Sequence, residues 1–107
     1  MTPDDFRRAA LSLPETTESA HMGHPDFRVR GKIFASLGWP DERWAMVKLT
    51  PEEQALFVDA EPAIFTPVKG GWGRQGSTNI RLEAANEPTV HSALTTAWRN
   101  SLARKRR

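Results

Sequence analysis

The same helix-start signal occurs twice in the chain, near residue 2 and near residue 50. The segment between the two helices that it predicts is long enough only for short strands. Residues 2–5 read TPDD and residues 50–53 read TPEE. In each copy the threonine hydroxyl can cap the first turn, the proline suits the first helical position, and the acids favour the positive end of the helix dipole. Glu53 also completes a capping box with Thr50. We therefore expect a helix to begin at each signal.

Between these helices the hydrophobic period changes from that of a helix to that of a strand. Residues 26–30 read DFRVR and alternate polar and apolar side chains, as a half-buried strand does. Residues 32–37 and 44–49 are two further strand candidates. Gly31 and the polar stretch 38–43 separate the three strands by short turns.

After the second helix the sequence predicts two more strands and a third helix. Residues 64–68 form a short extended stretch, and residues 78–84 alternate an apolar face with a polar one. The third helix is expected to open near residues 86–88, while Pro14 and Pro62 are expected to end the first two. Apolar side chains at helical spacing predict the buried faces: Phe6, Ala9, Ala10 and Leu13, then Leu56, Phe57 and Ala60, then Val90, Leu94, Ala97, Trp98 and Leu102.

The expected order of elements is α-β-β-β-α-β-β-α, which places the chain in the α+β class. Consecutive strands joined by short turns favour antiparallel pairing, so a doubly wound parallel sheet is not expected. We expect one antiparallel sheet of about five strands, with helices on one face and the other face partly open.

Composition sets the remaining limits. The length of 107 residues favours one domain over residues 1–103, followed by a basic tail over 104–107. Four of the 15 basic side chains fall in this tail, so the 13 acidic side chains outnumber the bases before it. The chain has no cysteine, which suggests a reducing compartment, and no apolar run long enough for a membrane span. We therefore expect a cytoplasmic protein that does not enter membranes.

A glycine-rich stretch, residues 70–78, reads GGWGRQGST and contains the spacing of two phosphate-binding motifs. Both motifs need a helix after the last glycine, because the free N–H groups of its first turn hold the anion. The residues after Gly76 alternate as a strand instead, and Ser77 stands where a P-loop has its lysine. We therefore expect these glycines to form a hairpin turn rather than a nucleotide cradle.

The hairpin interpretation leaves two positions open for Trp72. In one, the indole folds back into the core. In the other, it stays partly exposed at the tip, flanked by bases, a combination that binds phosphates and stacks on nucleobases. The candidate nucleic-acid-binding residues are Lys48, Lys69, Trp72, Arg74 and Arg81.

A second polar stretch, residues 21–26, reads HMGHPD and could form a ligand-binding turn through His21, His24 and Asp26. Two imidazoles and an acid can ligate a metal, but a polar loop whose histidines bond the backbone is the simpler interpretation, so we expect no metal site. Trp39 and Trp44, beside the turn at 38–43, are expected to serve packing. The sequence has no cysteine nucleophile and no G-x-S-x-G elbow. We therefore expect no catalytic residues, no cofactor and no enzyme.

Several separated motifs resemble the MmcQ/YjbR-like family of small bacterial proteins. They are ESAHMGHPDFRV at 18–29, GKIFA at 31–35, MVKLTPE at 46–52, the glycine loop around Trp72, and the closing helix around Trp98. The resemblance extends over roughly residues 4–100. It implies an α+β fold of the kind shared with secretion chaperones and likened to CyaY and frataxin. It also implies DNA binding through a double wing of hairpins, and it transfers no catalytic residue.

Two main hypotheses follow. In the first, the protein is a non-enzymatic DNA binder that uses the loops 38–43 and 69–77 as wings, with the basic tail adding sequence-independent attraction. In the second, it is a protein- or small-ligand-binding module that uses the open sheet face. A weaker third hypothesis is a frataxin-like acidic metal surface, for which the first helix offers only Asp4 and Asp5.

Overall fold

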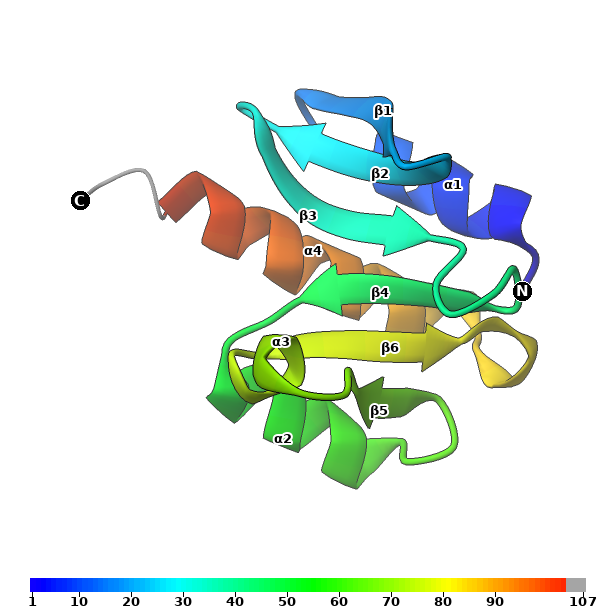
Figure 1. The fold of residues 1–107 in the computed structure, drawn as a ribbon, viewed down its shortest axis with the longest axis vertical. Coiled ribbons are helices and arrows are strands. Elements are labelled where there is room, and N and C mark those ends of the chain that lie inside the picture. The colour runs from blue at the N-terminus through cyan, green and yellow to red at the C-terminus, as the bar shows by residue number, and fades with distance from the viewer. Residues whose placement is uncertain (104–107) are drawn as a thin grey trace.

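The computed structural model describes residues 1–103, so the predicted basic tail, 104–107, lies outside the described residues. Its elements follow one another around a single sheet (Figure 1). In chain order they are α1 (Pro3–Leu11), β1 (Thr16–His21), β2 (His24–Val29), β3 (Lys32–Leu37), β4 (Trp44–Lys48), α2 (Pro51–Ala60), β5 (Phe65–Pro67), α3 (Gly71–Arg74), β6 (Ser77–Arg81), the 3-10 turn η1 (Leu82–Ala84) and α4 (Glu87–Ala103).

The sheet is antiparallel throughout and has six strands in the order β1-β2-β3-β4-β6-β5. The predicted α+β class with one antiparallel sheet is therefore confirmed, with one more strand than expected. The additional strand is β1, which pairs with β2 across a turn at Met22–Gly23. Most of its side chains are exposed on both faces, so the polar sequence TTESAH lacks the alternation that identifies a half-buried strand.

One face of the sheet is covered by α1 and α4, which lie behind it in Figure 1. Alternate residues of the central strands point into this layer, where they meet Phe6 of α1 and Leu94 of α4 in a fully buried core. Phe6 and Phe27 pack edge to face, with ring centroids 6.0 Å apart. The residues of the central strands in this core are Phe27, Val29, Phe34, Ala35, Leu37, Ala45, Val47 and Ile80.

Helix α2 covers only the β5–β6 edge of the sheet, and its predicted buried face is partly wrong. Leu56 is 70% exposed and Ala60 is also exposed, because α2 turns Phe57 and Val58 toward the core instead. Phe57 is half-buried and packs on Phe65, with ring centroids 5.1 Å apart. The Nε2 of Gln54 donates hydrogen bonds of 3.0 Å to the carbonyls of Gly73 and Ser77, which holds α2 against α3 and β6.

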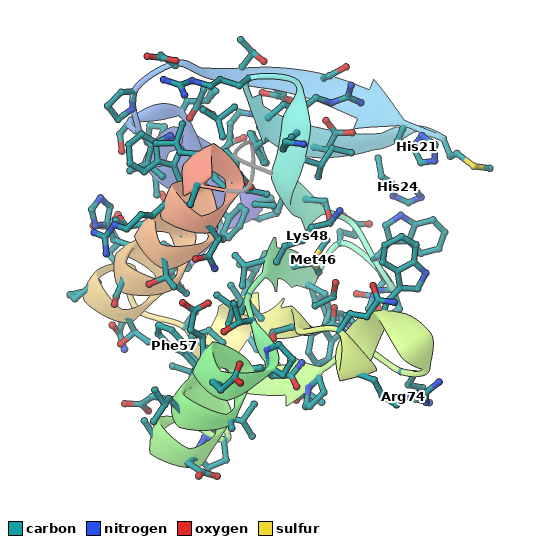
Figure 2. The ribbon with its side chains drawn as sticks, turned by 90° about the vertical axis from the view of Figure 1, so that its left-hand side faces the viewer. His21, His24, Met46, Lys48, Phe57 and Arg74 are labelled. Atoms are coloured by element: carbon teal, nitrogen blue, oxygen red, sulfur yellow. The ribbon has the colours of Figure 1, made fainter. Side chains whose placement is uncertain are left out.

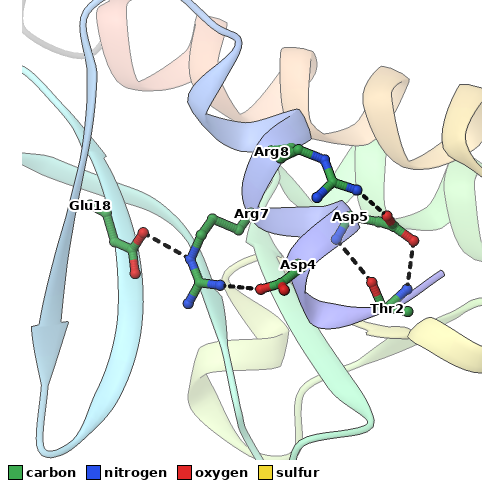
Figure 3. Close-up of polar contacts among 6 residues, drawn as sticks. All are labelled: Thr2, Asp4, Asp5, Arg7, Arg8 and Glu18. Atoms are coloured by element: carbon green, nitrogen blue, oxygen red, sulfur yellow. Dashed lines mark hydrogen bonds and ion pairs between the residues drawn. The ribbon is translucent and has the colours of Figure 1, made fainter.

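The helix-start signals work as predicted. The Thr2 hydroxyl accepts from the N–H of Asp5 while the Asp5 carboxylate accepts from the N–H of Thr2, and Thr50 and Glu53 make the same reciprocal pair. The hydrogen bond from the Thr2 backbone lowers the pKa of Asp5. Figure 3 shows how Arg7 extends this network, pairing with Asp4 on its own helix and with Glu18 on β1.

The predicted strand pair after α2 is present, since β5 and β6 pair antiparallel, but a helical turn replaces the expected simple hairpin loop. Helix α3 lies in front of β6 in Figure 1, on the face that α1 and α4 leave open. At two of the glycine positions another backbone segment comes too close for any side chain to fit. A Cβ on Gly73 would lie 1.6 Å from the carbonyl oxygen of Val68, and one on Gly76 would lie 1.9 Å from that of Leu49. The strand predicted over 78–84 ends at Arg81, and η1 follows.

The contact at Gly73 can be tested with a matched pair of substitutions. Gly73→Ala is expected to lower the free energy of unfolding by about 2 kcal/mol, because the new methyl group overlaps the Val68 backbone. Gly71→Ala, in the same helix, meets nothing nearer than Arg74 at 3.7 Å. It is therefore expected to change the free energy of unfolding by no more than about 1 kcal/mol, in the stabilising direction. Urea unfolding measures both values, and equal effects would contradict the packing role of Gly73.

Candidate functional site

The open face of the sheet contains a pocket of about 680 Å³. This volume lies within the range typical of small-molecule sites, roughly 300–1,000 Å³. In Figure 2, α4 and Phe57 lie on one side of the sheet, and His21, His24, Met46 and Lys48 lie on the other. The residues lining the pocket are His21, His24, Asp26, Ile33, Ser36, Trp39, Pro40, Met46, Lys48, Val68, Lys69, Trp72, Ser77 and Asn79.

The floor of the pocket is built by the residues that alternate with the core. In β4 the side chains of Ala45 and Val47 are buried under α4, so those of Met46 and Lys48 point to the open face. The same alternation in β6 brings Asn79 to the floor. In the sheet Met46 lies directly opposite Asn79 and also opposite Ser36 of β3, so three strands contribute neighbouring side chains.

Two exposed tryptophans line the pocket. Trp72, on α3, is 63% exposed, so of the two positions considered from the sequence the core position is wrong. Trp39, in the loop between β3 and β4, is 52% exposed and packs on His24 with ring centroids 4.2 Å apart and ring planes tilted by 38°. The expected packing of Trp39 is therefore present, and another part of its surface lines the pocket.

The loop that carries Trp39 is held by its own polar contacts. The carboxylate of Asp41 accepts hydrogen bonds from the Arg43 backbone at 2.9 Å and from the Arg43 guanidinium at 3.0 Å. These bonds lower the pKa of Asp41 and raise that of Arg43, with the side-chain bond as the largest cause in each case. Asp41 therefore stabilises the turn next to the pocket and stands outside its lining.

The charge of the one carboxylate in the lining is already balanced. Asp26 is 2% exposed, and its two oxygens accept from Nε of Arg28 at 2.8 Å and from Nη2 of Arg28 at 3.2 Å. The hydrogen bond to Asp26 raises the pKa of Arg28. Lys48 and Lys69 add positive charge to the same lining, and Nζ of Lys48 lies 5.6 Å from the centroid of the Trp72 ring.

The structure brings together only some of the residues predicted to bind nucleic acid. Lys48, Lys69 and Trp72 meet at the pocket, whereas Arg74 and Arg81 are not among its lining residues. Figure 2 shows Arg74 well separated from His24, on the far side of α3. The guanidinium of Arg81 lies 4.7 Å from the ring centroid of Trp44 and 3.5 Å from the carboxylate of Glu83.

The predicted ligand-binding turn is also present at the pocket, with a different local structure. His21, His24 and Asp26 all line the pocket, but His24 and Asp26 belong to β2 and only Met22–Gly23 forms the turn. Within residues 1–103 no cluster of histidine, cysteine and acidic side chains is arranged to hold a metal ion. No helix in the same range has the length and apolar character of a membrane span.

The apolar and amide part of the lining, above all Ile33, Met46 and Asn79, was not expected from the sequence. Met46 and Asn79 alternate with buried neighbours in β4 and β6, so their side of the sheet was predictable. Ile33 has the same parity as the buried Ala35 and Leu37, and it reaches the pocket because the pairing of β2 with β3 is irregular there. The strand sequences do not show, however, that α3 lies on the face of the sheet opposite α1 and α4. Without that knowledge this face is expected to be open to solvent.

Comparison with known proteins gives a family and a fold. The family model described as YjbR matches residues 11–100. The crystal structure of Deinococcus radiodurans protein DR2400, with the family-model domain DUF419, is similar with a TM-score of 0.71 and 17% sequence identity, covering 91% of this chain and 75% of that chain. At this identity the likeness concerns the fold. No curated protein matches the sequence.

The pairing of Asp26 with Arg28 yields a testable coupling. Arg28→Met is expected to destabilise the protein, because it leaves the buried carboxylate of Asp26 without its counterion. Adding Asp26→Asn is expected to recover part of the loss, since a neutral amide needs no counterion. A double-mutant cycle of urea unfolding measures the coupling. Additive effects of the two substitutions would show that the pair is not a structural unit.

Proposed function

The chain belongs to the YjbR family, and from this premise we propose that it is a non-enzymatic binding module whose open sheet face takes a small ligand. The observation that carries the proposal is the pocket of about 680 Å³ with Trp39 and Trp72 exposed in its lining. Large apolar side chains gathered in a concave surface are typical of ligand sites.

The composition of the lining supports a ligand of mixed character. The side chains of Ile33, Met46 and Val68 offer apolar contact, while Asn79 can both donate and accept hydrogen bonds. A few polar groups on a largely apolar surface are how small-molecule sites fix the orientation of what they bind. A flat, uniformly charged surface would favour a polymer instead.

Binding rather than catalysis is supported by the state of Asp26. Both of its oxygens accept hydrogen bonds from Arg28, so a reacting group would have to compete with the guanidinium for them. The ring of His24 lies 4.2 Å from that of Trp39, centroid to centroid, which supports a part for His24 in the pocket wall. The cytoplasm is kept as the proposed location because the sequence has no cysteine.

DNA binding remains the second candidate, and one observation favours it. Both loops predicted as wings border the same surface, the first through Trp39 and Pro40, the second through Lys69 and Trp72. Arg74 is exposed on the second loop and could reach a phosphate beyond the pocket. The small ligand is preferred because the side chains of the two loops line a concavity, and because the Arg81 guanidinium is already beside Glu83.

Blocking the pocket tests the small-ligand proposal. A fragment library screened by ¹H–¹⁵N NMR is expected to shift the indole N–H signals of Trp39 and Trp72. Ser36→Phe fills the floor and is expected to abolish these shifts, while Ser92→Phe, at an exposed position on α4, is expected to preserve them. Fragments that bind nowhere near the pocket, or shifts that survive Ser36→Phe in the folded protein, would refute the proposal.

The DNA candidate has its own test. If it holds, fluorescence anisotropy with a labelled duplex shows an affinity that falls steeply between two salt concentrations. Arg74→Ala is then expected to weaken binding several-fold, roughly one phosphate contact, relative to Arg99→Ala on α4. A chain ending at residue 103 separates any contribution of the basic tail. Equal binding by the two arginine variants would remove the second loop from DNA recognition.

A further inference from the structure

We infer that the ligand of the pocket is a small aromatic anion, a flat ring carrying one carboxylate or phosphate group. The inference rests on the proposed function, because it concerns the chemistry of what the same pocket binds. The fold alone does not imply this chemistry. It follows from the charges and rings that the lining brings together.

The lining of the pocket favours a negatively charged ligand. Its one carboxylate, Asp26, forms two hydrogen bonds with Arg28, so that pair adds no net charge. Lys69 is exposed in the same lining and adds a positive charge, and Lys48 brings an ammonium group that also has contacts within the protein. A ligand with a negative group therefore gains attraction at the pocket, and a positively charged ligand meets repulsion.

The ammonium of Lys48 lies beside an aromatic ring. Its Nζ lies 5.6 Å from the ring centroid of Trp72. An acidic group that bonds this ammonium lies next to the indole, so a ring attached to the acid through a short linker can contact the indole while the charges pair. A purely aliphatic anion would leave the exposed surface of Trp72 in water.

The second tryptophan is held in place by contacts within the protein. Trp39 packs on His24 with ring centroids 4.2 Å apart, and the neighbouring turn is held by the bonds between Asp41 and Arg43. An aromatic ligand can contact this indole without ordering a mobile side chain, which lowers the entropic cost of binding. Asn79 on the floor can bond a ring heteroatom or substituent.

Matched probes separate charge from shape. With the full chain, isothermal titration calorimetry compares indole-3-acetate, its neutral amide indole-3-acetamide, and the cation tryptamine. Adenosine monophosphate and adenosine repeat the comparison for a phosphate. The anion of each set is expected to bind about tenfold more tightly than its neutral counterpart, as for one charge-assisted contact. Which anion binds more tightly distinguishes a carboxylate ligand from a phosphate ligand.

Variants assign the preference to the two lysines. Lys69→Met and Lys48→Met are expected to remove the advantage of the anion while neutral probes bind as before, and Lys32→Met, exposed on β3 outside the lining, is expected to preserve it. Lys69 is exposed, so its variant stays informative if Lys48→Met fails to fold.

The outcomes separate the inference from the proposed function. Neutral or cationic probes that bind the pocket as tightly as the anions, or a preference that survives both lysine variants, would overturn the inference and leave a ligand-binding pocket. A short oligothymidylate that binds more tightly than adenosine monophosphate would overturn it in favour of DNA. No pocket binding by any small probe would remove the proposed function itself.

Discussion

The structure depends on the two-residue period of the strand backbone. In β4 and β6 a side chain that points under the helices obliges its neighbour to face the other way, whereas in β3 the irregular pairing with β2 leaves the consecutive Phe34 and Ala35 both buried. Because Ala45 and Val47 are buried, Met46 and Lys48 cannot be, and because Ile80 is buried, Asn79 lies on the pocket floor. The core and the floor of the candidate site are therefore formed by opposite faces of the same strands. A shift in the register of one strand would alter both at once.

This constraint explains why so much of the fold is predictable. Alternation in β2, β3, β4 and β6, together with the Thr-Pro-acid-acid signals, carries local information about structure. Where the local signal is absent, prediction fails. Strand β1 is polar on both faces because it lies at the edge of the sheet, and its pairing with β2 comes from backbone bonds that any side chain permits. The exposure of Leu56 has another origin, since the tertiary packing of α2 turns Phe57 and Val58 toward the core and leaves Leu56 outside.

Individual residues of the candidate site were predictable from the sequence, but their common location was not. Lys48, Lys69, Trp72, His21, His24 and Asp26 were all candidates from the sequence, but they were assigned to a DNA-binding wing and a separate turn. These residues are brought together in one pocket by the tertiary fold. Their meeting requires α3 to lie on the open face and Trp39 to pack on His24, and both depend on contacts between segments distant in sequence. The same distance explains why the contact between Arg81 and Trp44 was missed, whereas the pairs Asp26–Arg28 and Arg81–Glu83 join residues only two positions apart.

The glycine at position 73 has a consequence for how this family could diversify. At Gly73 the backbone of α3 lies so close to the Val68 carbonyl that there is no room for a methyl group. The path of the backbone is therefore fixed there, and so is the position from which the side chain of residue 72 extends. Exchanging the indole for another side chain is therefore expected to change the lining of the pocket without disturbing the backbone beneath it. A single codon can thus alter this surface while the fold stays the same.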